Sequence, residues 1–83
     1  MNKEMDTSNI KIQIASDVNE RDGIGLELYL RGKLVIEIFR DDTKKTREIN
    51  VFEDSVSVEL MEYAISEFKK KVPKEFIDYT ILD

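Results

Sequence analysis

Over the first two thirds of the chain, aliphatic residues recur at every second position, the period of a strand with one buried face. Four such stretches follow one another, at residues 10–15, 24–31, 34–39 and 48–52. Short polar connections separate them, which is typical of an antiparallel meander. The aliphatic residues of the expected buried face are Ile10, Ile12, Ile14, Ile24, Leu26, Leu28, Leu30, Leu34, Ile36, Ile38, Ile49 and Val51.

The turn around Gly32 decides the register of the second and third strands. A two-residue turn would pair Leu28 with Val35 and set core residues against the wrong face. A three-residue turn over residues 30–32, with Gly32 at positive φ, pairs Leu28 with Leu34 instead. We therefore expect the three-residue turn. The same matching predicts the pairs Leu26 with Ile36, Ile24 with Ile38, Val18 with Ile24, Ile14 with Leu28, Ile38 with Ile49 and Ile36 with Val51.

The last third of the chain changes to a helical period. Ser57 is the expected N-cap, and Val56 and Met61 have the spacing of a hydrophobic staple. Pro73 should end the helix near Val72. The apolar side of the predicted helix consists of Leu60, Met61, Ala64, Ile65, Phe68 and Val72.

One helix is too narrow to cover the predicted sheet. Four strands span about 19 Å, whereas a helix is about 10 Å wide. We expect Phe76, Ile81 and Leu82 from the C-terminal segment to cover the remainder. The sequence thus predicts an α+β fold, β-β-β-β-α plus a short C-terminal segment, as one domain over residues 9–83 after a disordered tail at 1–8.

Composition narrows function mainly by exclusion. The chain has 83 residues, 41% hydrophobic and 37% charged, which indicates one small folded domain rather than a disordered one. It contains no Cys, His or Trp, so disulfides, thiolate or imidazole metal sites and His-assisted nucleophiles are excluded. The net charge of −5 argues against nucleic acid as a partner.

The remaining candidates for chemistry are weak. Residues 17–23 resemble a calcium loop, but Arg21 and Asp22 stand where that loop needs an oxygen ligand and a glycine. The adjacent acids Asp41 and Asp42 are expected to be solvated turn residues, and no serine has a partner His or a Ser-x-x-Lys motif. We therefore expect no enzyme activity, no metal or other cofactor and no small-molecule site.

The lysines near the end of the predicted helix and the lack of long apolar runs argue against two further classes, polyanion-binding proteins and membrane proteins. The cluster Lys69, Lys70, Lys71 and Lys74 complements the helix dipole at its C-terminal end, and we expect no polyanion site there. Neither a signal-peptide core nor an apolar run long enough to span a membrane is visible. The expected location is the cytoplasm.

The outer face of the predicted sheet is the most informative surface. An aromatic and aliphatic centre there is bordered by glutamates, as in many protein interfaces. Cross-strand aromatic pairs also stabilise ordinary sheets, so both explanations stay open. The candidate partner-binding residues are Glu27, Tyr29, Val35, Glu37, Phe39, Glu48 and Phe52.

The function predicted from these observations is a small acidic, non-catalytic module that binds a protein partner through the outer sheet face or an edge strand. One alternative is a self-assembling homodimer that pairs a face or an edge. Another is an immunity-type inhibitor of a basic toxin, which the charge of −5 would suit. A small carboxylate enzyme is disfavoured by the missing catalytic side chains.

Overall fold

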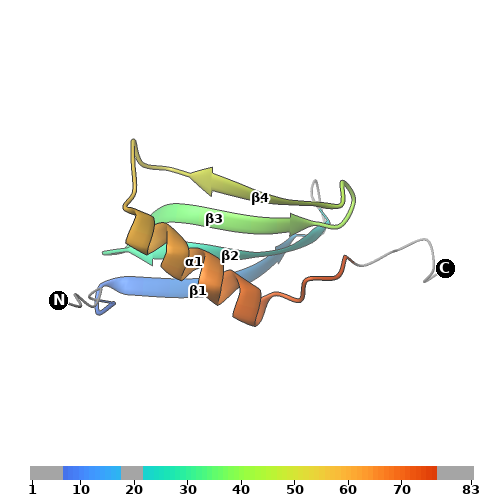
Figure 1. Ribbon diagram of the computed structural model, residues 1–83, viewed down its shortest axis with the longest axis horizontal. Helices are drawn as coiled ribbons and strands as arrows, with labels where there is room; N and C mark the ends of the chain where they lie inside the picture. Colours follow the sequence, from blue (N-terminus) through green and yellow to red (C-terminus); the bar gives the residue numbers. More distant parts are fainter. Residues whose placement is uncertain (1–6, 18–21, 77–83) are drawn as a thin grey trace.

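The protein folds as a four-stranded antiparallel sheet with one helix across one face (Figure 1). The computed structural model describes residues 7–17 and 22–76. The strands follow in chain order, as β1 (Ile10–Asp17), β2 (Gly23–Leu30), β3 (Lys33–Asp41) and β4 (Thr46–Val51), and the helix is α1 (Val58–Lys71). The predicted α+β meander is therefore confirmed.

The helix begins and ends where the sequence predicts. The Ser57 hydroxyl accepts a hydrogen bond of 3.0 Å from the Leu60 amide, which satisfies a free donor of the first turn. At the other end, the Val72 amide donates to the Phe68 carbonyl at 2.9 Å. Val72 is already extended, as the residue before Pro73 should be.

The register predicted for one outer strand pair is confirmed, and the register predicted for the other is wrong. Between β3 and β4 the structure confirms Ile38 opposite Ile49 and Ile36 opposite Val51. Between β1 and β2 the prediction is wrong by two residues, since Ile14 lies opposite Leu26 rather than Leu28. A shift of two leaves every side chain on its own face, so face matching could not detect it. The predicted partner Val18 lies outside the described residues.

The predicted turn between β2 and β3 is also wrong. The turn has two residues, Arg31 and Gly32, and Leu30 pairs with Lys33. Both turn residues have positive φ, at 54° for Arg31 and 83° for Gly32. That combination is the favoured two-residue hairpin turn, and the positive φ predicted for Gly32 is confirmed.

A β-bulge then restores the matching of the aliphatic faces. Tyr29 pairs with Leu34 but Leu28 pairs with Ile36, so Val35 is an extra residue on β3. Beyond it Leu26 lies opposite Ile38. The predicted pairs Leu28 with Leu34, Leu26 with Ile36 and Ile24 with Ile38 are therefore wrong by two residues. The aliphatic faces still meet, but the extra residue lies in the strand instead of in the turn.

The core lies between α1 and the middle of the sheet. Leu26, Leu28 and Ile36 are fully buried there, and α1 packs on β2 and β3. β4 lies beyond the helix at the edge of the sheet (Figure 1), where Ile49 remains 45% exposed and Val51 40% exposed. The buried core residues are Leu26, Leu28, Val35, Ile36, Ile38, Leu60, Ala64, Phe68 and Val72.

Candidate functional site

The predicted outer-face patch is not assembled as the sequence suggested. Val35 is 3% exposed and packs in the core under α1 with residues such as Leu60, so placing it on the outer face is wrong. The bulge is the cause, because the extra residue disturbs the strict alternation of side chains along β3. The alternation along β3 alone placed Val35 on the outer face, whereas the rejected two-residue turn would have set it opposite Leu28.

Phe39 is likewise not an exposed aromatic, since only 2% of it is accessible. It lies opposite Gly25, and a methyl group added to Gly25 would lie 2.7 Å from the Phe39 ring. The ring also lies close to Gly23, so it fills the space that two missing side chains leave on β2. Phe39 therefore acts in sheet packing, which was the competing explanation for the aromatic patch.

The other predicted residues make local polar contacts. The Tyr29 hydroxyl donates to Glu27 at 2.9 Å, and this hydrogen bond to a carboxylate raises the pKa of the Tyr29 phenol. Asn50 donates to Glu37 at 3.0 Å. Thr46 donates to Glu48 at 2.8 Å. Phe52, just after β4, is 50% exposed, so of the predicted centre it alone offers a large apolar surface to a partner.

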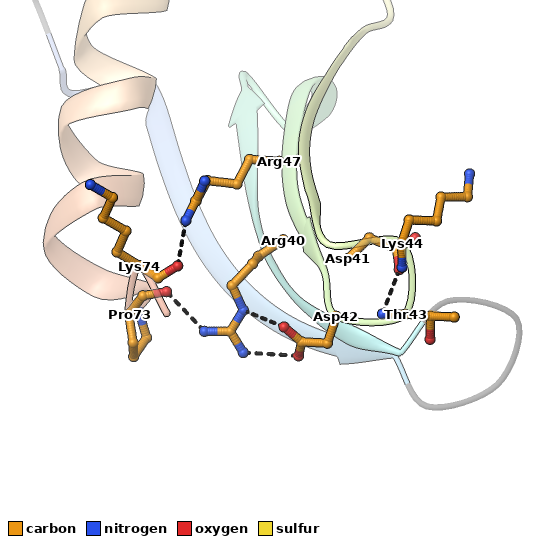
Figure 2. Close-up of polar contacts among 8 residues, drawn as sticks. All are labelled: Arg40, Asp41, Asp42, Thr43, Lys44, Arg47, Pro73 and Lys74. Carbon is orange, nitrogen blue, oxygen red and sulfur yellow. Dashed lines mark hydrogen bonds and ion pairs between the residues drawn. The ribbon is translucent and has the colours of Figure 1, made fainter. Parts of the chain in front are cut away.

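A buried ion pair joins the β3–β4 hairpin to the end of the helix, and the sequence did not predict it (Figure 2). Arg40 and Asp42 are 3% and 2% exposed. Their side chains form two parallel hydrogen bonds, Nε to Oδ1 at 2.9 Å and Nη2 to Oδ2 at 3.0 Å. The remaining Arg40 Nη1 donates to the Pro73 carbonyl at 2.8 Å. The expectation that Asp42 is solvated is wrong, because Arg40 accompanies it into the interior.

Asp41 is buried for a different reason. Its Oδ1 accepts from the amides of Thr43 and Lys44, at 3.0 and 2.9 Å, and so shapes the turn (Figure 2). Lys45 closes this turn at a φ of 60°. Neither acid is a candidate general acid or base, because the hydrogen bonds of Asp41 and the ion pair of Asp42 serve the fold.

A second arginine fixes the segment that follows the helix. Arg47, near the start of β4, donates from Nη2 to the Lys74 carbonyl at 2.6 Å. Its guanidinium lies 4.5 Å from the centre of the Phe76 ring, a cation–π contact. Phe76 is half-buried against Arg47, and the expectation that it covers the part of the sheet left bare by the helix stays a prediction, since Ile49 and Val51 remain exposed. Ile81 and Leu82, which we expected to do the same, lie outside the described residues.

Between α1 and β4 lies a groove of about 580 Å³. It exists because the helix covers β2 and β3 and leaves β4 bare, as its width relative to four strands suggested. Its lining combines five apolar side chains with three charged ones, and this volume lies within the range of ligand pockets. The groove is lined by Ile38, Arg47, Ile49, Ile65, Phe68, Lys69, Val72 and Lys74.

The backbone of β4 is open along the side away from β3. The Phe52 amide donates to the Val35 carbonyl on β3 at 2.8 Å. Backbone groups alternate along an antiparallel strand, so those of Val51, Ile49 and Arg47 point away from β3. The edge therefore presents amides and carbonyls directly beside the groove.

Comparisons with known proteins add no functional information. A scan of family models and searches of curated proteins and of solved structures give no match to this chain. The function rests on geometry alone. Among residues 7–17 and 22–76, no cluster of acidic side chains is arranged to hold a metal ion. In the same part of the chain, no helix has the length and apolar character needed to cross a bilayer.

Proposed function

We propose that the protein is a non-catalytic interaction module that binds an extended segment of a protein partner along β4. The observation that carries this proposal is the exposure of Ile49 and Val51, at 45% and 40%, on an edge strand whose outward backbone groups have no neighbouring strand among the described residues. Their cross-strand neighbours Ile38 and Ile36 are 3% and 0% exposed.

Addition of a partner strand would use both the open backbone groups of β4 and its exposed aliphatic side chains. Main-chain hydrogen bonds to β4 supply affinity, and side chains at alternate positions of the added strand enter the groove and supply specificity. Long apolar edge strands are a hazard that most proteins blunt with charge or proline. β4 carries Arg47 and Glu48 near its start, but its second half contains no charged residue and no proline.

The polar clusters support a non-catalytic role. Arg40 donates to the Asp42 carboxylate and to the Pro73 carbonyl, and the Asp41 carboxylate accepts from turn amides. Within residues 7–17 and 22–76, these bonds engage the side chains of Arg40, Asp41 and Asp42 in the fold. The lining of the groove includes three cations and no carboxylate.

The test uses a proline at the open edge. The Ile49 amide points away from β3, so Ile49→Pro removes an edge donor without breaking a bond of the sheet. The matched control Ile49→Ala loses the side chain and keeps the amide. Tagged wild-type protein should capture a partner from extracts of the cells that make it, and Ile49→Pro should reduce capture at least tenfold more than Ile49→Ala does. Equal capture by wild type and Ile49→Pro, with both proteins folded by circular dichroism, would rule out binding through β4.

A further inference from the structure

The surface along β4 and the groove is apolar at one end and basic at the other, and this difference indicates the chemistry of a partner that would fit. Ile49 and Val51 form the apolar end of the strand face, and Arg47 stands at the other end. Lys69 and Lys74 belong to the same lining as Arg47, and the Arg47 side chain bonds the Lys74 carbonyl (Figure 2). The face of β4 thus runs from an aliphatic end at Val51, just beyond the lining of the groove, through Ile49 to a basic end at Arg47.

None of these three cations has an ion-pair partner among the described residues, and the Arg47 guanidinium is already bound to the Lys74 carbonyl. The next lysines on α1 are paired, since Lys70 and Lys71 lie 3.4 and 2.9 Å from the carboxylate of Glu67. Lys69 and Lys74 have no such contact in the described part of the chain. In a protein with a net charge of −5, unpaired cations beside an apolar floor form a local site for a negative group.

We propose that the groove recognises a partner segment with two aliphatic side chains at alternate positions, followed two residues later by a carboxylate. This inference rests on the proposed binding along β4. A strand added antiparallel to β4, the orientation of every pair in this sheet, runs from the Val51 end toward Arg47. Its groove-facing side chains would meet Val51, then Ile49, and then the basic end, where Lys69 and Lys74 hold the carboxylate.

A second copy of this chain meets the spacing requirement only with a carboxylate that is already paired. Ile49, Val51 and Glu53 have the required spacing, but Glu53 lies after β4 and its carboxylate pairs with Lys33 of the same chain at 2.6 Å. A copy would also add its own Lys69 and Lys74 to the same face of the joined sheet. An acidic segment of another protein brings a free carboxylate and adds no lysines, so charge complementarity favours it over self-pairing.

The probe is a labelled synthetic peptide of about seven residues, centred on Ile-Thr-Val-Thr-Glu, measured by fluorescence anisotropy against the full chain. Lys69→Glu and Lys74→Glu should each weaken binding about fivefold, because each reverses a charge at the carboxylate. Lys11→Glu on β1 makes the same change of charge on the opposite edge and should change binding less than about twofold. A second peptide with Lys in place of Glu should bind at least about tenfold more weakly to wild type.

Several results would overturn the inference. One such result is that Ile49→Pro abolishes peptide binding while both lysine reversals leave it unchanged. In that case β4 binds an added strand without recognising its carboxylate, so the proposed function stands and the further inference fails. Unchanged binding in all three variants removes both proposals. Tighter binding of the Lys peptide would identify a basic partner, as an immunity-type inhibitor requires. A doubled mass by light scattering, lost in Ile49→Pro, would identify a second copy. A tenfold gain in peptide affinity in Ile81→Asp would show that the C-terminal segment of this chain is the occupant.

Discussion

The helix-side face of the sheet has two halves that look alike in sequence and differ in structure. Under α1, Leu28 on β2 and Ile36 on β3 are fully buried. On β4, Ile49 and Val51 continue the same face and remain 45% and 40% exposed. The aliphatic pattern is as regular in the exposed half as in the buried half.

This difference shows that strand periodicity reports which face a residue lies on and says nothing of what covers that face. The cover depends on where the helix crosses and on what fixes its end. Here the Arg40 side chain binds the Pro73 carbonyl, and Arg47 binds the Lys74 carbonyl, so both arginines hold the segment after α1 at the hairpin (Figure 2). The exposed half of the face therefore follows from the fixed position of the helix. This explanation can be tested by substitutions in either half.

The largest effect is expected where the helix end is anchored. Arg40→Ala leaves the Asp42 carboxylate buried without its partner and should lower the free energy of unfolding by about 3–5 kcal/mol. Urea denaturation measures this loss. The double variant with Met at 40 and Leu at 42 removes both charges and should recover most of it. A loss below about 1 kcal/mol in Arg40→Ala would show that the pair does not anchor the helix end.

The next largest effect is expected when the buried half of the face is compared directly with the exposed half. Leu28→Ala removes a fully buried side chain and should cost about 3 kcal/mol, including the cavity it leaves. Ile49→Ala removes one that is nearly half exposed and should cost about 1 kcal/mol or less. Both are read from the same denaturation curves. Equal losses would mean that β4 is covered in solution and that the groove is filled.

The turn that precedes the bulge should give a smaller effect of predictable sign. Arg31 holds a φ of 54°, which costs a non-glycine residue energy, and Asn tolerates it better. Arg31→Asn should therefore raise the melting temperature, with a gain of about 0.5 kcal/mol. Gly32→Val, at a φ of 83°, should lower stability by about 1 kcal/mol or more. If both substitutions are neutral, the hairpin does not hold this turn in solution.

The smallest effect should come from the solvent side of the helix. Hydrogen bonding to Lys71, aided by Lys70, holds the pKa of Glu67 below its ordinary value. A lowered pKa in the folded state stabilises the protein above the unfolded pKa of about 4.3, and the gain is lost as the pH falls through the lowered value. Wild type should thus exceed Glu67→Gln slightly in stability at pH 7, with the difference vanishing at acidic pH. A difference that persists at low pH would assign it to packing instead.

The sequence by itself determined the elements, the helix ends and the faces of the strands away from the bulge. Alternation of aliphatic residues suffices to identify a strand and its buried side, and Ser57 and Pro73 suffice to bound a helix, since each signal acts over a few neighbouring residues. The pairing of Ile38 with Ile49 followed from the same matching of faces and is confirmed.

Tertiary structure decided the register of β1, the bulge and the functional surface. A slip of two residues preserves the faces, so only side-chain packing could set Ile14 opposite Leu26. The extra residue Val35 packs in the core, and the Phe39 ring packs over two glycines of β2. For these two reasons the patch predicted for the outer face does not form. The groove and the buried Arg40–Asp42 pair join residues far apart in the chain to the helix end, and no local pattern encodes such a meeting.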